Sequence, residues 1–166
     1  MSTCESMPNT GPECSEVPDK PPIHVVAAVI YDNHNRDRIL ISKRPEHVHQ
    51  GGLWEFPGGK VDLGETAYQA LLRELLEELD IEVTEARPLM QISHNYADKQ
   101  VFLDIWSVLS FTGQARGVEG QECRWLSLRE LLLEGADYQF PEANRPILEK
   151  LRSLIDPLTD QTSSSN

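Results

Sequence analysis

The sequence predicts a single globular domain of the α/β class. The chain has 166 residues, of which 39% are apolar and 25% are charged, and this length and composition are typical of one domain with one hydrophobic core. Short runs rich in valine, isoleucine and leucine alternate with segments of helical periodicity, which favours a fold that mixes strands and helices. The sequence contains no internal repeat that would indicate a solenoid or a propeller.

The two ends of the chain differ in composition from its middle. Residues 1–22 carry five prolines and four acidic residues against one lysine, and such a segment buries too little apolar surface to offset the entropy of ordering it. The other end is polar and rich in serine. We therefore expect disordered tails at 1–22 and 158–166 and a folded domain over 23–157.

Three segments are expected to form strands. Ile23–Ile30 and Arg38–Lys43 are rich in valine, isoleucine and leucine and flank the turn-forming run Asp32–Asn35, which predicts a hairpin. Val101–Leu109 is largely apolar on both of its faces, as a strand covered on each side is. We therefore expect it near the centre of the sheet.

Three helices are indicated by start signals. They are expected at 67–79, 128–134 and 145–155. The first two follow capping boxes, in which Thr66 is paired with Gln69 and Ser127 with Glu130. Asn144 precedes the third helix and could serve as its N-cap.

The charge and the cysteines exclude several classes of protein. The chain has 15 Lys+Arg against 27 Asp+Glu and a net charge of −12, so a nucleic acid polymer would be repelled at long range. No apolar run of membrane-spanning length and no signal peptide are expected. The cysteines, Cys4, Cys14 and Cys123, lack metal-type spacing. Together these features predict a cytoplasmic protein without membrane or nucleic acid partners.

The segment 67–79 carries an apolar face and an acidic one. Its apolar arc, at 100° per residue, is expected to face the core and comprises Tyr68, Leu71, Leu72, Leu75, Leu76 and Leu79. Glu74, Glu77 and Glu78 fall together on the opposite arc. One interpretation is a solvated acidic face that is partly neutralised by Arg73. The other is a site for a divalent cation, Mg²⁺ or Mn²⁺, because such ions prefer carboxylate oxygens.

The loop before this helix favours the cation site. It contains three glycines, which permit close approach of the main chain to a ligand. The loop and the helix follow the pattern G-x5-E-x7-R-E-U-x-E-E-x-G-U, where U is a bulky aliphatic residue, at Gly59, Glu65, Arg73, Glu74, Leu75, Glu77, Glu78 and Ile81. This pattern resembles the Nudix box, the signature of hydrolases that act on nucleoside diphosphates linked to another moiety. Asp80 stands where the family has glycine, and because Asp tolerates the left-handed conformation, we expect local strain rather than loss of function.

The resemblance implies an α/β/α sandwich with a mixed β-sheet and assigns roles within the box. The implied metal ligands are the carbonyl of Gly58 or Gly59 and the side chains of Glu74, Glu77 and Glu78. Arg73 would orient these glutamates, and Glu65 would support the loop. The implied reaction is attack of water on phosphorus, in which metal ions neutralise the phosphate oxygens and acidify water.

Outside the box the sequence is similar to the MutT-like branch of the family, which removes oxidised guanine nucleotides. The similar segments are 55–60, 119–121 with 125–127, and 140–146. The resemblance implies that Glu119 approaches the metal and the attacking water, that Asn144 reads the guanine base and that Phe56 contacts it. Arg44 would lie near the phosphates or the base, and Lys99 replaces an arginine of the family. The implied substrate-binding residues are thus Arg44, Phe56, Lys60, Lys99 and Asn144.

Several of these residues have simpler interpretations. Asn144 could be only a cap, Phe56 would ordinarily belong to the core, and Glu119 taken alone is an ordinary loop carboxylate. His47 and His49 lack a third ligand, so we expect them in a solvated or substrate-lining loop rather than at a metal.

The predicted function is Mg²⁺-dependent hydrolysis of 8-oxo-dGTP, or a related oxidised purine nucleotide, to the monophosphate and pyrophosphate by a monomeric enzyme. One alternative is a CTP or dCTP pyrophosphohydrolase. Another is a non-catalytic nucleotide-binding module on the same fold. The complete carboxylate set favours an enzyme, because a module that only binds could lose one carboxylate without penalty.

Overall fold

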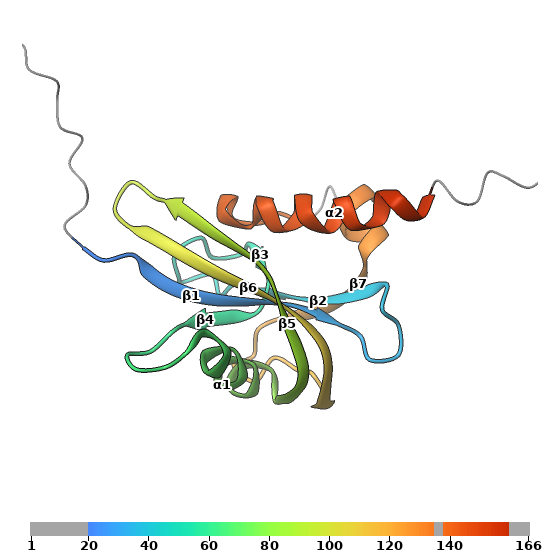
Figure 1. Cartoon of the computed structure of the whole chain (residues 1–166), viewed down its shortest axis with the longest axis horizontal. Coiled ribbons are helices and arrows are strands. Elements are labelled where there is room, and N and C mark those ends of the chain that lie inside the picture. Colours follow the sequence, from blue (N-terminus) through green and yellow to red (C-terminus); the bar gives the residue numbers. More distant parts are fainter. Residues whose placement is uncertain (1–19, 135–137, 160–166) are drawn as a thin grey trace, which may run out of the picture.

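The computed structural model describes residues 20–134 and 138–159 (Figure 1). Its elements are β1 (Ile23–Tyr31), β2 (Arg38–Lys43), β3 (Trp54–Glu55), β4 (Gly58–Lys60), α1 (Ala67–Leu79), β5 (Ile81–Asn95), β6 (Gln100–Gly113), β7 (Cys123–Ser127), η1 (Glu130–Glu134), η2 (Glu142–Asn144) and α2 (Arg145–Thr159). The predicted tails lie mostly outside the described residues, although α2 continues past the expected domain end at 157. Within these ranges no helix has the length and apolar composition that crossing a membrane requires.

Seven strands of the described residues form one mixed sheet. The strand order is β3-β2-β1-β6-β5, with β4 paired to β1 and β7 paired to β2. β1 and β6 run parallel, and the other pairs are antiparallel. The predicted hairpin of β1 and β2 is confirmed. The predicted central strand is confirmed as well, because β6 lies between β1 and β5.

The sequence gives no clear signal for β5, which lies at the edge of this sheet. Most of its residues are exposed or half-buried, and the buried positions do not recur at every second residue. Its pairing with β6 shifts register between Val83 and Glu85, between Glu85 and Ala86, and between Pro88 and Met90. These irregularities break the period of two on which recognition of a strand depends.

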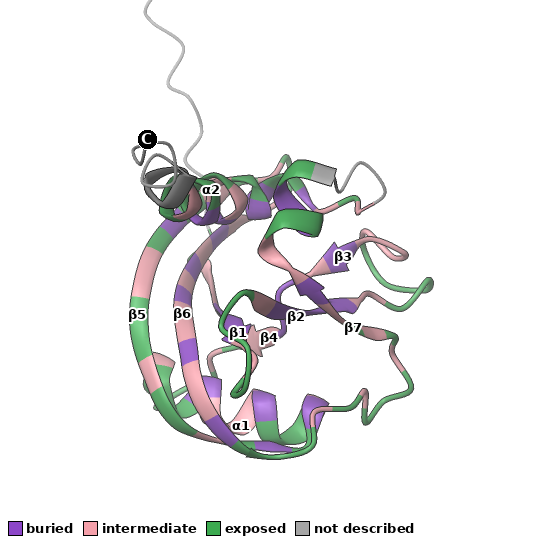
Figure 2. Cartoon of the chain, turned by 90° about the vertical axis from the view of Figure 1, so that its right-hand side faces the viewer, coloured by how far each residue is buried: buried purple, intermediate pink, exposed green. Residues whose placement is uncertain are grey.

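Helices cover both faces of the sheet, which confirms the α/β/α prediction (Figure 1). On one face Ile147 and Leu151 of α2 join a core with side chains of β1, β2 and β6. On the other face Leu71 and Leu75 of α1 join a second core. Figure 2 shows the buried positions along the strands between these two helices.

Helix α1 begins and ends as predicted. The Thr66 hydroxyl accepts a hydrogen bond from the Gln69 N–H at 3.2 Å, and the Gln69 side chain accepts one from the Thr66 N–H at 2.9 Å, which completes the capping box. Asp80 ends the helix in the left-handed region, with φ 59° and ψ 38°. Its carboxylate accepts two hydrogen bonds from Arg116. The conformation expected for Asp at the family's glycine position is therefore confirmed.

The predicted core face of α1 is only partly correct. Tyr68 and Leu76 are 39% and 48% exposed, whereas Ala70 is fully buried. The buried residues of α1 are Ala70, Leu71, Leu75 and Leu79. Leu76 lies outside the arc that these four residues span, whereas Tyr68 lies one turn before it along the helix. Glu74, whose side chain is 14% exposed, lies within this arc rather than opposite it.

The predicted helix at 128–134 is also different in the structure. The capping contacts form, because the Ser127 N–H donates to the Glu130 carboxylate at 2.7 Å and the Glu130 N–H donates to the Ser127 hydroxyl at 3.1 Å. The residues that follow, η1, nevertheless form a π-helical turn. In a π turn the backbone hydrogen bonds join residues five apart, whereas in an α-helix they join residues four apart. Over so few residues the pattern of apolar side chains does not distinguish the two.

The third predicted helix starts without the expected cap. Asn144 is the last residue of the 3₁₀ turn η2, which runs directly into α2, and its N–H donates to the Pro141 carbonyl at 2.9 Å. A residue whose N–H is already bonded within helical structure has passed the cap position. Among residues 20–134 and 138–159, the Asn144 side chain makes no capping hydrogen bond. The N-cap interpretation of Asn144 is therefore wrong.

Candidate active site

A cleft of about 300 Å³ lies beside η2 and brings together segments that are far apart in the sequence. Its apolar floor comes from β1 and β6, through residues such as Val25 and Leu103. The predicted site residues that line it are Arg44, Phe56, Gly58, Gly59, Lys60, Lys99 and Asn144. All of the predicted substrate-binding residues thus surround one cavity.

An aromatic ring and an amide define one end of this cleft. Phe56 is 3% exposed, and its ring stacks on Phe140 with 5.4 Å between centroids and 30° between planes. Asn144 is 9% exposed and lines the cleft. Within the described ranges its side chain has no hydrogen-bond partner, and none of its polar atoms is sealed off from the cleft. Its amide can therefore donate to and accept from a bound molecule. We call this region the base end.

Backbone forms the middle of the cleft. Gly58 and Gly59 of β4 pair with Ala27 and Val26 of β1. A Cβ at Gly58 would lie 2.0 Å from the Val26 carbonyl oxygen, and one at Gly59 would lie 2.3 Å from the carboxyl carbon of Glu74. The backbone of β1 excludes a side chain at Gly58, and a side chain at Gly59 would displace the Glu74 carboxylate, which lies directly against the main chain of β4.

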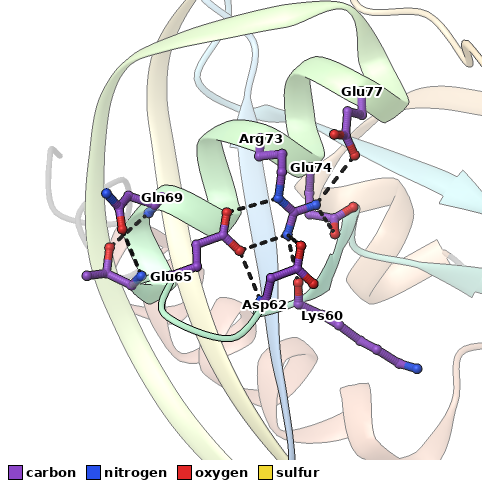
Figure 3. A network of polar contacts seen from close by, with 8 residues as sticks. Lys60, Asp62, Glu65, Gln69, Arg73, Glu74 and Glu77 are labelled. Carbon is purple, nitrogen blue, oxygen red and sulfur yellow. Dashed lines mark hydrogen bonds and ion pairs between the residues drawn. The ribbon is translucent and has the colours of Figure 1, made fainter.

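Arg73 connects α1 to the preceding loop (Figure 3). Its guanidinium donates to both carboxylate oxygens of Glu65 at 2.9 Å, to Glu74 at 2.8 Å and to the Lys60 carbonyl at 2.9 Å. A longer contact of 3.4 Å reaches Glu77. The hydrogen bonds from Arg73 hold the pKa of Glu65 below its usual range. The geometry agrees with the orienting role that the resemblance implies for Arg73 and with the supporting role of Glu65.

Glu78 lies at the point where the negative charges of the site meet. Burial, the largest cause, and the neighbouring charges of Glu74, Glu55 and Glu119 together raise its pKa to about 8. The Gly58 N–H, which is hydrogen-bonded to Glu78, acts in the opposite direction. Four carboxylates from three segments therefore repel one another here. We call this region the acidic end. Of its carboxylates only Glu55 lines the cleft itself; Glu74 and Glu78 adjoin it through Gly59 and Gly58.

The loop after β6 is fixed over the last turn of α1. The Val118 N–H donates to the Glu78 carbonyl at 2.9 Å, and the Gln121 side chain donates to the same oxygen at 3.0 Å. The Glu119 N–H donates to the Gln121 side chain at 2.9 Å. The first two bonds satisfy the Glu78 carbonyl, which the helix end leaves free, and the loop brings Glu119 close enough to affect the pKa of Glu78.

The acidic end has the chemistry of a divalent cation site. In residues 20–134 and 138–159 no three acidic, histidine or cysteine side chains are close enough together to hold an ion as they stand. Glu74 is turned towards Arg73, and the Glu77 side chain is 59% exposed. A divalent cation would, however, remove the repulsion that Glu74, Glu55 and Glu119 exert on Glu78, and carboxylate oxygens suit Mg²⁺.

Arg44 lines the cleft and is paired with Glu55. Its Nε also donates to the His49 carbonyl at 3.1 Å. Burial raises the pKa of Glu55, and Arg44 lowers it. In the sequence Glu55 stands out only as part of a segment similar to the family. In the structure it lines the cleft, and its charge raises the pKa of Glu78.

Tyr96 lines the cleft and was missed by sequence reasoning. Its ring centroid lies 4.5 Å from that of His94 and 6.0 Å from that of His49, and the Lys99 Nζ lies 5.5 Å from it. Because Tyr96 follows a strand that the pattern does not reveal, no sequence signal marks it. His49 lines the cleft, as one of its two interpretations expected, and His47 is not among the lining residues.

Comparison with known proteins places the chain in a family. Residues 26–150 match the model of the NUDIX domain, and the chain therefore belongs to the Nudix hydrolase family. Members of this family generally depend on divalent metal ions.

Proteins of similar sequence are named as hydrolases of nucleoside triphosphates. The chain is 42% identical over 106 residues to an 8-oxo-dGTP diphosphatase of Proteus vulgaris, an alignment that covers 64% of this chain and 92% of that protein. It is 37% identical over 129 residues to the 8-oxo-dGTP diphosphatase of Escherichia coli, covering 78% and 96%. A CTP pyrophosphohydrolase of Escherichia coli is 39% identical over 133 residues, covering 80% and 93%.

Solved structures of similar proteins share the fold. A structure from a study of MutT from Aliivibrio salmonicida and Vibrio cholerae is 40% identical and superposes with a TM-score of 0.69, covering 81% of this chain and 99% of that chain. MutT Nudix hydrolase from Burkholderia pseudomallei is 29% identical with a TM-score of 0.69, covering 79% and 98%.

Proposed function

We propose that this chain is a Mg²⁺-dependent pyrophosphohydrolase of 8-oxo-dGTP or a related oxidised purine nucleotide, releasing the monophosphate and pyrophosphate. The observation that carries the proposal is one cleft lined by a buried ring, by an amide that has no partner among the described residues, and by the glycine backbone of β4, against which the clustered carboxylates lie. The names of the relatives from Proteus vulgaris and Escherichia coli support the same substrate.

The acidic end is proposed to hold the metal. Its ligands would be Glu74, Glu77, Glu78 and Glu119 together with the carbonyl of Gly58 or Gly59. When bound, Mg²⁺ would supply positive charge to the phosphate oxygens and lower the pKa of the attacking water; Mn²⁺ could replace it.

Protein side chains perform the remaining tasks. Arg73 restrains the Glu74 carboxylate beside β4 through a hydrogen bond of 2.8 Å. Lys60 and Lys99 line the cleft and bring positive charge to a protein whose net charge is −12. Such charge offsets the repulsion of an anionic nucleotide.

Base selection is proposed to depend on Asn144 and Phe56. The amide of Asn144 presents a donor and an acceptor to the edge of the base, and the ring of Phe56 offers an apolar contact. A base that leaves this buried amide unpaired binds less well, by roughly 1 to 3 kcal/mol.

A substrate panel tests this function directly. Hydrolysis of 8-oxo-dGTP, dGTP, dCTP and CTP is measured with and without Mg²⁺, with identification of the products. We expect activity only with the metal, the highest kcat/KM for 8-oxo-dGTP, and pyrophosphate as a product. A preference for dCTP or CTP would reject the oxidised purine as substrate, and absence of turnover with every nucleotide and metal would reject an enzyme.

One observation favours a second candidate function. The CTP pyrophosphohydrolase of Escherichia coli is as similar to this chain as the 8-oxo-dGTP diphosphatases are. A pyrimidine triphosphate is therefore the competing substrate. The monomeric state and the cytoplasmic location remain predictions.

A further inference from the structure

We infer that Trp54, Tyr138 and Arg124 form a brace behind the base end that fixes the width of the cleft and thereby its base selectivity. The inference rests on the proposed function and names the residues that position its base-reading groups. Trp54 and Tyr138 do not line the cleft, so they would act through Phe56 and Asn144 as positioning residues.

The contacts within the brace centre on one indole. Trp54 is 7% exposed. The Tyr138 ring packs edge-on against it, with 5.5 Å between centroids and 72° between planes. The Arg124 guanidinium lies over the same indole, 5.1 Å from its centroid, and is hydrogen-bonded to Tyr138. Edge-to-face packing and a cation over an aromatic ring are both favourable, so the three side chains stabilise one another.

The brace lies where the two walls of the base end meet. The Trp54 N–H donates to the Gln139 carbonyl at 2.8 Å, which joins β3 to the segment before η2. From Trp54 the chain continues through Glu55 to Phe56, which forms one wall. From Gln139 it continues through Phe140 to the residues of η2, which form the other wall. The stacking of Phe56 on Phe140 ties the walls together a second time.

This junction sets the gap in which a base would lie. Both Phe56 and Asn144 are within a few residues of the Trp54–Gln139 hydrogen bond. A shift of β3 or of the segment before η2 at that bond therefore moves the ring relative to the amide. Hydrogen bonds weaken steeply when their length or angle is wrong, so a small change in the gap alters discrimination between bases more than it alters hydrolysis itself.

A second tyrosine–tryptophan pair provides a matched control. Tyr68 of α1 lies 5.3 Å from the ring of Trp106 in β6, and neither residue lines the cleft. Replacing either tyrosine removes one ring from one indole. Only the replacement at Tyr138 should affect base selection, whereas both should affect packing.

The test compares Tyr138→Leu with Tyr68→Leu in the full chain. The measurements are kcat and KM for 8-oxo-dGTP and dGTP, the Kd values of 8-oxo-dGMP and dGMP, and the Tm. For Tyr138→Leu we expect the selectivity ratio to fall by about threefold to tenfold, mainly through KM, as expected for a weakened base hydrogen bond. For Tyr68→Leu we expect the wild-type ratio. An unchanged ratio in Tyr138→Leu, or an equal change in both variants, would overturn the inference.

A milder variant covers the case in which Tyr138→Leu does not fold. Arg124→Gln keeps both rings, and its side chain is 49% exposed, so the domain should fold. The selectivity ratio should shift in the same direction by a smaller factor, and a wild-type ratio would count against the brace. The wild-type panel separates the two proposals: if the wild type does not prefer 8-oxo-dGTP, the proposed function fails, whereas the brace is still judged by whether the variants change the ratio of the two monophosphate Kd values.

Discussion

The acidic end and the base end of the cleft are held by different forces. At the acidic end, Arg73 ties Glu65 and Glu74 by hydrogen bonds, while the carboxylates around Glu78 repel one another. At the base end, buried rings such as Phe56 are held by stacking. The acidic end therefore stores unfavourable electrostatic energy that a ligand can release, whereas the base end is already stable without one. Substitutions at the two ends should therefore have different consequences.

The largest effect is expected from Glu78→Gln. It removes a proposed ligand and the buried carboxyl group on which the neighbouring charges act, so kcat should fall by several orders of magnitude while the Tm of the metal-free protein is unchanged or higher. Glu149→Gln, an exposed glutamate of α2, is the control and should retain full activity. Steady-state kinetics and thermal denaturation provide the readouts. A loss of Tm in proportion to the loss of activity would indicate a structural role for Glu78.

A smaller loss is expected from Arg73→Lys. Lysine keeps the charge but cannot donate in parallel to both oxygens of Glu65 while it holds Glu74. Partners that orient metal ligands typically contribute about 10-fold to 100-fold, and kcat should fall by such a factor. Arg87→Lys, at an exposed pair with Glu85, should have no effect. Kinetics at several Mg²⁺ concentrations check this, and wild-type kcat and metal dependence in Arg73→Lys would contradict it.

At the base end, Asn144→Ser should change preference rather than general activity. Serine cannot span the edge of a base as an amide does, so kcat/KM for 8-oxo-dGTP should fall about tenfold relative to dGTP. Because the structure shows no capping bond from this side chain among the described residues, Asn144→Ala should not lose the stability of an N-cap. If Asn144→Ser retains the wild-type ratio of the two rates, Asn144 does not read the base.

The smallest expected effect is a pH dependence of stability. In the metal-free protein the pKa of Glu78 is about 8, against an ordinary value of 4.5, so the folded state binds more protons than the unfolded state between these pH values. The stabilisation that comes from protonated Glu78 is complete below about pH 4.5 and is lost as the pH rises through about 8. Over this range the free energy of unfolding should fall by at most about 1.4 kcal/mol per pH unit. Unfolding by denaturant at several pH values should show this decline in the wild type. Glu78→Gln should remove it, and an equal slope in both proteins would exclude Glu78 as its source.

Sequence patterns predicted the elements whose signals are local. The capping box at Thr66 and the period of α1 lie within one helix, and the β1–β2 hairpin lies within two adjacent runs. The π turn, the position of Asn144 and the exposure of Leu76 depend on how neighbouring elements pack, which a helical wheel does not contain. Tertiary packing decides these features.

The candidate site shows the same division. Its glutamates and Gly59 follow a motif of fixed spacing, and the predicted substrate-binding residues were found through similar segments. Tyr96 and Trp54 belong to no such motif, and their relation to the cleft depends on contacts between β3, the β5–β6 turn and the segment before η2. Only three-dimensional coordinates reveal residues of this kind.

The irregular edge strand β5 has a consequence for association between copies of the chain. An exposed strand edge can act as a template onto which another chain adds by backbone hydrogen bonding. Here Pro88 supplies no N–H, and the register shifts on both sides of it interrupt the regular row of donors and acceptors. Charged residues such as Glu85 and Arg87 add a further barrier to a flat apolar contact. The longest strand of the sheet is thus a poor nucleus for aggregation, even when the protein is concentrated.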